Sequence, residues 1–448
     1  MTKRGVAIVV LAAGQGTRMK SQLPKVLHSV AGRPMLRHVL DAGASLEPDR
    51  VVVVVGKGQE QVAAAAAPAT AAVQNPPRGT GHAVMAALPA LNGFDGDVVV
   101  LFGDTPLLTP DLLKRLVEAR RGEGDPAAVV VGFTPAEPAA YGRLILGSEN
   151  RLERIVEYKN ASAQERAVRL CNAGLMALDG ARLPLLLQQL SDDNAQGEYL
   201  LTDVVEHANA KRWLCRVVEA DPVEVMGINT RAELAQAEAA MQQRLRHRAM
   251  IDGVTLIAPE TVYLRSDTRF GRDVTVEPFV VFGDNVSVGD GVVIRSYSHI
   301  EGAAIAAGAT IGPFARLRPG AQIGLDAHIG NFVEIKQAAI EAGAKVNHLT
   351  YIGDARVGAK ANIGAGTITC NYDGFAKHFT DIGAGAFIGS NTALVAPVKV
   401  GDGAMVAAGS TITRDVPGDA LAVARGRQED IAGFAARFRS SRAAKKNK

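Results

Sequence analysis

The sequence is poor in the residues that mark several common protein classes. Only three cysteines, Cys171, Cys215 and Cys370, occur among 448 residues. They are far apart and odd in number, so they indicate neither a disulfide framework nor a zinc spacing. We therefore expect a reduced, cytoplasmic enzyme. The sequence also has no run of about 18 apolar residues, so we predict no membrane insertion.

An excess of charge of one sign is missing as well. The chain has 49 Lys and Arg against 46 Asp and Glu, a net charge of +3, which does not favour a nucleic-acid partner. Only the tail Arg439–Lys448 is strongly basic, and we interpret it as a solvated, disordered end. The apolar run Val6–Ala13 leads straight into Gly14 without a suitable cleavage site. We interpret it as a first strand and not as a signal peptide.

What the second half does contain is a repeat of six residues. Between Phe270 and Ile412 an aliphatic or aromatic residue, often followed by Gly, returns every six positions, with three steps of five. This period predicts a parallel β-helix of hexapeptides in which the repeated side chain faces inward. We expect the following Gly to adopt a positive φ and so to let the backbone turn each corner.

The first half instead alternates apolar runs with helical patterns. We predict buried strands at Val6–Leu11, Val51–Val55, Val98–Phe102 and Ala128–Phe133. We predict helices at Met35–Ser45, Gln59–Ala67, His82–Ala90 and Asp111–Arg120. This alternation is typical of an α/β domain with a Rossmann-like, mostly parallel sheet. Ligands of such sheets lie at the carboxyl ends of the strands, where Gly14 and Asp104 follow two of them.

The loop after the first predicted strand suits a phosphate. Gly14 and Gly16 leave room for backbone N–H groups to surround one, and Arg18 and Lys25 supply cations for a triphosphate. Met19 stands where the dinucleotide fingerprint needs a third Gly, and no Gly-Lys-Ser/Thr follows, so neither that motif nor a Walker loop is present. A Gly-X-Gly by itself is equally compatible with a plain tight turn.

Read on through Pro24-Lys25, the loop resembles that of pyrophosphorylase-type sugar-1-phosphate nucleotidyltransferases. Other segments typical of them follow in order: Gln74, Gly79-Thr80, Phe102-Gly103-Asp104, Tyr141-Gly142-Arg143, Ile155-Val156-Glu157, Asn172-Ala173-Gly174 and Gly227-Ile228-Asn229. With the hexapeptide region behind them, the whole chain resembles the bacterial bifunctional GlmU-type family. That resemblance implies a left-handed β-helix, acetylation of glucosamine 1-phosphate by acetyl-CoA, and uridylylation of the product by UTP. The final product would supply peptidoglycan and lipopolysaccharide synthesis.

The resemblance also implies a set of residues that bind UTP and the UDP-sugar. They are Leu11, Ala12, Ala13, Gly14, Lys25, Gln74, Gly79, Thr80, Phe102, Gly103, Asp104, Gly142, Glu157, Asn172 and Asn229. Asp104 and Asn229 would hold Mg²⁺, which suits few protein oxygens completed by waters and phosphate. Without the family context, Asp104 is equally explained as a turn or helix cap. Phe102 and Ala173 stand where Tyr and Thr are common, and each removes a possible hydroxyl contact.

In the implied uridylyl transfer, a phosphate oxygen of N-acetylglucosamine 1-phosphate attacks the α-phosphorus of UTP and expels pyrophosphate. Arg18, Lys25 and Mg²⁺ would stabilise the charge on the transferring group. A general base is not required, because the attacking phosphate is already ionised.

The repeat is interrupted between Ile363 and Ile382, and loops thrown out of a rigid solenoid are where function is expected. In the GlmU-type family this loop and the segment around His348 meet at the acetyl-transfer site. By similarity, glucosamine 1-phosphate would bind Arg318, Lys336, Tyr351, Asn362, Asn371, Tyr372 and Lys377. Acetyl-CoA would contact Ala365, Asn371, Tyr372, Ser390, Ala408 and Arg425. His348 would be the general base, with Glu334 orienting its imidazole. Backbone N–H groups near Tyr372 or Ser390 would stabilise the oxyanion.

Two further features need interpretation. His299, His328 and His348 are not offset by whole coils, so we do not expect a metal site among them. Apolar residues spaced three and four apart at Leu234, Ala237, Met241 and Leu245 predict one amphipathic linker helix. The predicted domains are a uridylyltransferase domain at residues 1–229, this linker at 230–251 and an acetyltransferase β-helix at 252–448.

Two alternatives stand beside the bifunctional reading: a single-function uridylyltransferase with a structural β-helix, and a binding or assembly module without turnover. His348, Lys336 and the Asn371-Tyr372 loop argue against the first, because a scaffold needs none of them. Arg18, Lys25 and Asp104 argue against the second. The family assembles its acetyltransferase site between neighbouring chains, which implies a homotrimer.

Overall fold

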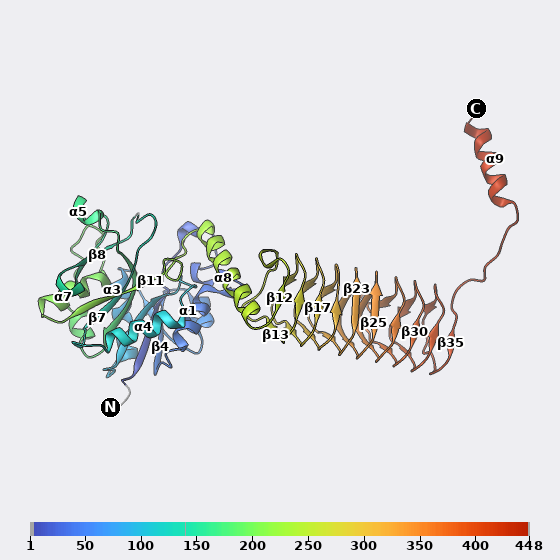
Figure 1. The fold of residues 1–448 in the computed structure, drawn as a ribbon, viewed down its shortest axis with the longest axis horizontal. Coiled ribbons are helices and arrows are strands. Elements are labelled where there is room, and N and C mark those ends of the chain that lie inside the picture. The colour runs from blue at the N-terminus through green and yellow to red at the C-terminus, as the bar shows by residue number, and fades with distance from the viewer. Residues whose placement is uncertain (1–3, 139, 447–448) are drawn as a thin grey trace. The chain divides into compact units, whose positions relative to one another are not determined.

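The structure, a computed structural model, describes residues 4–138 and 140–446 (Figure 1). The chain divides into two compact units, Met1–Leu245 and Arg246–Lys448. Helix α8 (Arg231–Ile251) spans that division, at the position of the predicted linker helix. Among the residues described, no helix is both long and apolar enough to cross a membrane.

The first unit is built on a mostly parallel sheet, as predicted. Its strand order is β11 (Cys215–Ala220), β7 (Ala128–Phe133), β10 (Cys171–Asp179), β6 (Asp97–Phe102), β1 (Val6–Leu11), β4 (Arg50–Gly56) and β5 (Thr70–Gln74). Strand β10 is antiparallel to β6 and β7, whereas the other neighbours pair in parallel. A hairpin of β8 (Arg143–Leu146) and β9 (Leu152–Val156) branches from β10.

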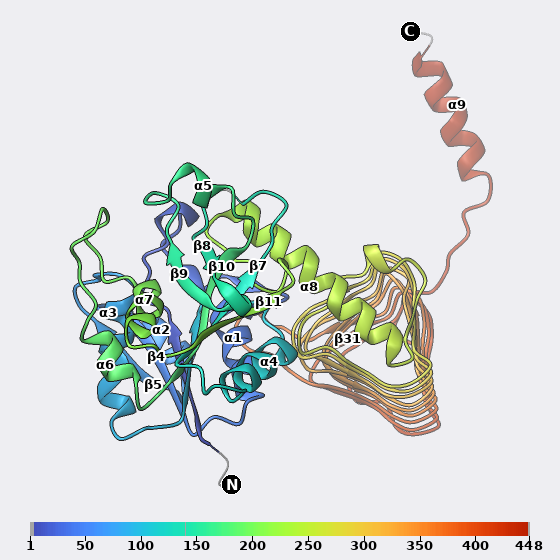
Figure 2. The same cartoon turned by 60° about the vertical axis from the view of Figure 1, so that its left-hand side comes forward.

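Both faces of this sheet are covered by helices, which is why its strands are continuous apolar runs (Figure 2). One face packs against α1 (Met35–Ala44), α2 (Glu60–Ala66) and α4 (Pro110–Arg120). The other packs against α3 (Thr80–Ala87), α6 (Leu183–Leu187) and α7 (Val204–Ala210). The unit also contains β2 (Ser29–Val30), β3 (Arg33–Pro34) and α5 (Ala163–Arg166).

The four predicted strands and four predicted helices of this unit are present, with one correction. The helix predicted at 82–90 starts earlier, at Thr80, and gives way to a 3-10 turn at Leu88–Leu91. Pro89 has no N–H to continue the α-helical hydrogen bonds, which explains the early end.

The second unit is a parallel β-helix of short strands, also as predicted. One sheet contains β12 (Thr255–Leu256), β14 (Thr275–Val276), β17 (Val293–Ile294), β20 (Thr310–Ile311), β23 (His328–Asn331), β25 (Lys345–His348), β27 (Asn362–Ile363), β30 (Phe387–Ile388), β33 (Met405–Val406) and β35 (Leu421–Ala422). A second contains β13 (Arg269–Phe270), β15 (Val281–Phe282), β16 (Ser287–Val288), β18 (His299–Ile300), β19 (Ala303–Ile305), β21 (Arg316–Leu317), β22 (Ala321–Ile323), β24 (Glu334–Ile340), β26 (Tyr351–Val357), β28 (Ile368–Cys370), β29 (Thr380–Ile382), β31 (Ala393–Val395), β32 (Val398–Val400) and β34 (Thr411–Ile412).

The register of these strands explains the irregular steps of the repeat. Val276 pairs with Ile294, 18 positions on, whereas a coil with one five-residue step advances by 17, as from Ile294 to Ile311. Between Ile363 and Ile388 the advance is 25, because the loop from residue 371 to 379 is inserted there. The predicted interruption therefore lies outside the regular coils.

The expected role of the repeated glycines is wrong at most positions. Gly289 and Gly364 do not have a positive φ, although Gly312 does, at 90°. A Cβ on Gly289 would lie 2.6 Å from the backbone nitrogen of Ala307, in the next coil, and one on Gly364 would lie 2.5 Å from that of Ser390. Glycine is therefore needed because successive coils approach closely. Left-handed residues occupy other turn positions, among them Asp273, Asn285, Gly291, Gly308, Asp326 and Lys360.

The prediction of a disordered basic tail is wrong for its described part, up to Lys446, whereas residues 447 and 448 lie outside the residues described. Residues Phe434–Lys446 form helix α9, and the side chains described there are exposed. Alanine, Arg and Lys dominate this segment, and their helix propensity accounts for the difference.

Candidate functional site

A cavity of about 310 Å³ opens at the carboxyl ends of β1, β5 and β6. Its lining includes most of the residues predicted to contact the nucleotide: Leu11, Ala12, Ala13, Gly14, Lys25, Gln74, Gly79, Thr80, Phe102 and Asp104. Val26, Pro77, Ala83 and Glu198 also line it and were not predicted. These segments are distant in sequence, and the fold of the sheet brings them together.

The two glycines of the first loop act differently. Gly16 adopts a φ of 62°, and a Cβ there would lie 2.5 Å from the Cβ of Lys25. Glycine thus lets the Lys25 side chain pack against the loop. A Cβ on Gly14 would meet nothing within 4 Å, so this residue keeps the cavity open without being required by packing.

Lys25 is the centre of a polar cluster at the mouth of this cavity. Its ammonium contacts the carboxylate of Asp104 and donates to Asn229 Oδ1 at 3.0 Å. Arg18 Nη2 donates to the same oxygen at 2.9 Å. The backbone N–H of Asn229 donates to Glu233 Oε2 at 2.7 Å. Asn229 is therefore positioned by the first turn of α8.

Asp104 and Asn229 have the chemistry expected of Mg²⁺ ligands. A carboxylate and an amide oxygen both contact one ammonium group, so a cation is accommodated between hard oxygen donors. Within residues 4–138 and 140–446, no group of three or more His, Cys, Asp or Glu side chains forms a closed metal cage. This donor set fits Mg²⁺, which completes its coordination with waters and phosphate.

The residues predicted to hold the sugar gather beside β10. The N–H of Asn172 donates to the carbonyl of Gly142 at 2.9 Å, and Asn172 Oδ1 accepts from the N–H of Gly174 at 2.9 Å. Gly174 has a φ of 85°, and a Cβ there would lie 2.6 Å from the Phe102 ring. Burial, together with the nearby carboxylate of Asp203, raises the pKa of Glu157.

Glu198 could not have been found from local sequence. Its segment reaches the cavity because Gly81 donates its N–H to the carbonyl of Tyr199 at 2.7 Å, and Tyr199 donates to Arg78 at 2.8 Å. Gly79, at a φ of 99°, leaves no space for a Cβ, which would lie 2.6 Å from the Tyr199 oxygen. This side of the cavity is formed by a contact between segments that are distant in sequence, so it cannot be seen in either segment alone.

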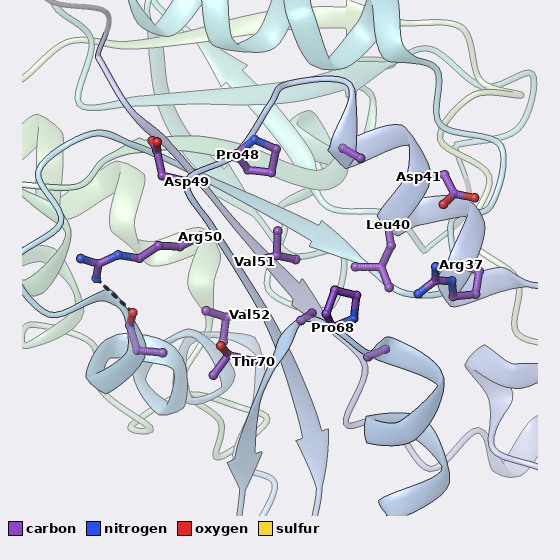
Figure 3. Close-up of a pocket in the computed structure, with 14 residues that line it drawn as sticks. Arg37, Leu40, Asp41, Pro48, Asp49, Arg50, Val51, Val52, Pro68 and Thr70 are labelled. Carbon is purple, nitrogen blue, oxygen red and sulfur yellow. Dashed lines mark hydrogen bonds between the residues drawn. The ribbon is translucent and has the colours of Figure 1, made fainter.

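Another cavity, of about 480 Å³, lies at the opposite, amino-terminal ends of β4 and β5 (Figure 3). Arg37 Nη1 donates to the carbonyl of Ala67 at 2.9 Å, and Arg50 Nη1 to that of Ala90 at 3.1 Å. Both guanidinium groups are thus engaged by backbone oxygens. None of the predicted site residues lines this cavity, so it is separate from the predicted nucleotide site.

In the β-helix, His348 lines a cavity of about 400 Å³ together with Asn331, Phe314 and Phe332. His348 Nδ1 lies 2.7 Å from Asn331 Oδ1. Glu334, expected to orient the imidazole, instead accepts a hydrogen bond from Arg318 Nη1 at 2.8 Å. Asn331 contacts the imidazole in its place, because β23 and β25 pair in register at these two residues.

The predicted ligands of the sugar phosphate surround one carboxylate. Asp354 Oδ2 lies 3.7 Å from Lys336 Nζ and 3.9 Å from Lys377 Nζ, and it accepts a hydrogen bond from Asn371 Nδ2. Asn371 also lies 3.4 Å from the hydroxyl of Tyr351. A hydrogen bond with the neighbouring Lys377 side chain is the main cause that lowers the pKa of Lys336.

Two predicted ligands lie apart from this cluster. Asn362 is in β27, a strand of the other sheet, where it pairs with Lys345. The Tyr372 hydroxyl donates to the carbonyl of Gly374 at 2.6 Å within the inserted loop, although Lys377 Nζ lies 5.9 Å from its ring centroid.

The predicted acetyl-CoA contacts form a column along successive coils. The carbonyl of Ala365 accepts from Asn391 at 2.7 Å, and that of Ser390 accepts from Gly409 at 2.8 Å. Arg425 Nη1 donates to the carbonyl of Ala408 at 2.8 Å. Asn371 and Tyr372 belong to the inserted loop and not to this column.

The three histidines do not stack on one face. His299 lies in β18 of one sheet, whereas His328 and His348 lie in β23 and β25 of the other. His328 pairs with Lys345, so His348 is three residues out of register with it.

Comparison with known proteins agrees with both halves. Residues 8–170 match the MobA-like NTP transferase domain, and residues 267–302 and 379–414 match bacterial transferase hexapeptide repeats. The chain is 58% identical to the bifunctional protein GlmU of Paramagnetospirillum magneticum over all of both chains. It is 61% identical to that of Rhodospirillum rubrum and 55% identical to that of Sphingopyxis alaskensis, over 98% of each chain. The chain therefore belongs to the family of bifunctional GlmU proteins.

Proposed function

We propose that this chain makes UDP-N-acetylglucosamine with two separate sites. The β-helix transfers an acetyl group from acetyl-CoA to glucosamine 1-phosphate. The α/β unit then joins N-acetylglucosamine 1-phosphate to UTP and releases pyrophosphate. One observation carries this proposal: a single chain contains both the Lys25, Asp104 and Asn229 cluster and the His348–Asn331 pair. A β-helix that served only as a scaffold would not need the His348–Asn331 pair.

In the α/β unit, the residues bind and orient charged groups and do not transfer protons. The nucleotide phosphates lie against the loop that carries Gly14, and Arg18 and Lys25 bring two cations to them. Since the attacking sugar phosphate is already ionised, positioning and charge neutralisation are sufficient for the reaction. Asp104 and Asn229 hold Mg²⁺, which when bound supplies further neutralisation of phosphate charge.

In the β-helix, His348 is the general base. With Nδ1–H donating to Asn331 Oδ1, the lone pair of Nε2 is available to accept a proton. His348 takes a proton from the glucosamine amino group as the nitrogen of that amino group attacks the thioester carbonyl. The new C–N bond forms, the C–S bond breaks, and the proton passes to the departing coenzyme A thiolate. Arg318, Lys336 and Lys377 hold the sugar phosphate during this step.

The β-helix functions as a homotrimer in this proposal. A column of aromatic rings at Phe279, Tyr297, Phe314 and Phe332 stacks along one corner, with centroids 5.1, 4.9 and 5.0 Å apart. Each ring-bearing residue has a positive φ, between 53° and 61°. Bulky residues in that conformation cost on the order of 1–3 kcal/mol each.

These four aromatic residues are each about half exposed, between 45% and 55%, and form a contiguous apolar strip of the kind that marks interaction sites. Phe314 and Phe332 also line the His348 cavity. A second copy of the chain that covers the strip would close that cavity. The exposed inserted loop, with Phe375 98% exposed, is the segment that such a copy would contribute.

The test is to incubate the purified protein with glucosamine 1-phosphate, acetyl-CoA, UTP and Mg²⁺, and to follow both products by mass spectrometry. Omission of acetyl-CoA should abolish the acetylated product, and omission of UTP should leave acetylation intact. Addition of EDTA should stop nucleotide transfer only. Light scattering at known concentration tests the trimer. If acetylation is absent with all components present, the single-function alternative is correct.

A further inference from the structure

The carboxylate of Asp354 occupies a central position among the groups that bind the sugar phosphate. Its Oδ2 atom contacts Lys336, Lys377 and Asn371. The side chain is only 22% exposed. Lys336 belongs to β24, whereas Asn371 and Lys377 lie near the two ends of the inserted loop. Asp354 therefore joins the regular coils to the insertion.

The backbone places Asp354 at this point for a definite reason. It has a φ of 47° within β26, and Gln337, its counterpart in the preceding coil, has a φ of 45°. Such a conformation is several-fold more accessible to Asp and Asn than to most other residues with a side chain. A short acidic side chain is therefore compatible with this left-handed corner of the coil.

The distances indicate an electrostatic role more than a hydrogen-bonded one. Separations of 3.7 and 3.9 Å to the two ammonium groups are longer than hydrogen bonds. The ammonium protons are thus not donated to Asp354 and can be donated to a phosphate. At the same time, a negative charge at this range offsets the repulsion between Lys336 and Lys377.

Lys377 and Asp354 act on Lys336 in opposite directions. A hydrogen bond with the Lys377 side chain is the first cause that lowers the pKa of Lys336, followed by desolvation, whereas the charge of Asp354 raises that pKa. Without the carboxylate, Lys336 would lose its proton at a lower pH. A sugar phosphate needs both lysines charged, because each contributes a charge-assisted hydrogen bond.

We propose that Asp354 is a positioning residue of the acetyltransferase site, which holds Lys336, Lys377 and Asn371 ready for the phosphate of the sugar substrate. It acts through these three residues and does not itself touch the reacting atoms. This inference rests on the proposed acetyl-transfer function. It adds a residue that has a role in substrate affinity and not in the chemical step.

The experiment compares wild-type protein with Asp354→Asn, which removes the charge but keeps the shape and the left-handed preference. The matched control is Asp273→Asn, an exposed aspartate with a φ of 56° in a distant coil. Steady-state acetyl transfer is measured against glucosamine 1-phosphate and against acetyl-CoA, from pH 6.5 to 9.5. Uridylyl transfer and the melting temperature of each variant are measured on the same samples.

In Asp354→Asn we expect the KM for glucosamine 1-phosphate to rise about tenfold, as for a lost interaction with a charged group. The KM for acetyl-CoA and the kcat should stay within about twofold of wild type. The rise in KM at alkaline pH should begin at a lower pH than in wild type, since Lys336 is then less stabilised in its charged form. Asp273→Asn should match wild type in all of these measurements.

Other results would overturn the inference. An unchanged KM for the sugar phosphate would mean that Asp354 has no role in binding it, and a lower KM would mean that Asp354 repels the substrate. A lower kcat together with a lower melting temperature, confined to Asp354→Asn, would assign it a structural role. If wild-type protein itself transfers no acetyl group, the proposed function fails, and that outcome is distinct from an active wild type with a normal Asp354→Asn variant.

Discussion

In the α/β unit, the side chains around the nucleotide cavity come from the ends of separate strands, whereas in the β-helix they come from successive coils along the flank. Leu11 and Phe102 end two parallel strands, and the cavity between them is a consequence of the sheet. Glu334 and Tyr351 are instead paired neighbours in the register of the coils. The first arrangement gathers segments that are distant in sequence around one cavity. The second places residues of neighbouring coils side by side.

This contrast predicts that a substitution in one site abolishes one activity and leaves the other intact. The reciprocal pair of variants His348→Ala and Asp104→Ala tests this prediction. His348→Ala should lower acetyl transfer by about 10²- to 10⁴-fold, the usual contribution of a general base, and leave uridylyl transfer unchanged. Asp104→Ala should have the opposite pattern, with a loss of roughly a hundredfold or more, since an oxygen ligand beside Lys25 is removed. Both activities are assayed on the same preparation.

A matched control is His328→Ala, which also lines the His348 cavity but has no hydrogen bond to Asn331. It should retain most acetyl transfer. The independence of the two sites would be refuted if either primary variant reduced both activities equally while the protein remained folded.

Within the β-helix, glycine is used in two ways, and a pair of substitutions can separate the two physical causes. In Gly289→Ala a Cβ would meet the backbone of the next coil at 2.6 Å, whereas Gly291 has a φ of 66° and open space around it. We expect Gly289→Ala to cost about 1–3 kcal/mol through overpacking. Gly291→Asn should be nearly neutral, since Asp273 and Asn285 adopt a positive φ at comparable turns.

Unfolding of the β-helix in denaturant, followed by loss of acetyl transfer, measures both changes. The uridylyl activity serves as an internal reference, because these glycines lie in the second unit. A larger loss for Gly291→Asn than for Gly289→Ala would restore the expectation that positive φ, and not coil spacing, selects glycine in the repeat.

Sequence patterns predicted the elements well because both units have strong local signals. Continuous apolar runs marked β1, β4 and β6, and the six-residue period marked the β-helix. The pattern could not reveal why glycine follows the buried residue, since contact with the next coil is not local. It also could not reveal Glu198, which reaches the nucleotide cavity only through the contact between Tyr199 and Gly81.

The site residues also divide into those that a local motif reveals and those that only long-range contacts reveal. Those carried by a short motif, such as Gly14, Lys25 and Asp104, lie around one cavity. The hydrogen-bond partner of His348 could not be found from a motif, because Asn331 lies 17 positions earlier and reaches it only through coil register. Glu334 was the expected partner, and its pairing with Arg318 depends on the same register.

Asn331→Leu therefore tests the correction directly. Loss of the acceptor for Nδ1–H should lower the acetyl-transfer kcat about tenfold, the effect of one lost hydrogen bond of about 1.4 kcal/mol. Asn331→Asp keeps an acceptor oxygen and should retain most of the rate. Glu334→Gln should raise the KM for glucosamine 1-phosphate and leave kcat nearly unchanged, since it acts through Arg318. If Glu334→Gln lowers kcat and Asn331→Leu does not, the original assignment of Glu334 is correct.

The smallest expected effect concerns stability in the α/β unit, where the carboxylate of Glu157, predicted to bind the sugar, is partly buried. Burial and then Asp203 raise the folded-state pKa of Glu157 above its ordinary value. The folded protein therefore holds this proton more tightly than the unfolded chain, and its stability falls as pH rises through the raised pKa. Glu157→Gln removes that loss, so its melting temperature should exceed that of wild type at pH 7.5.

The gain in melting temperature from Glu157→Gln should shrink toward pH 4.5, where the carboxyl is increasingly protonated in both the folded and the unfolded state. Its exposed neighbour in β9 provides the control, since Glu153→Gln should not show this pH dependence. Uridylyl transfer should weaken in Glu157→Gln, because a residue placed for the sugar is changed at the same time. A melting temperature that is lower than wild type at pH 7.5, or a gain that does not vary with pH, would show that Glu157 is held in its charged form.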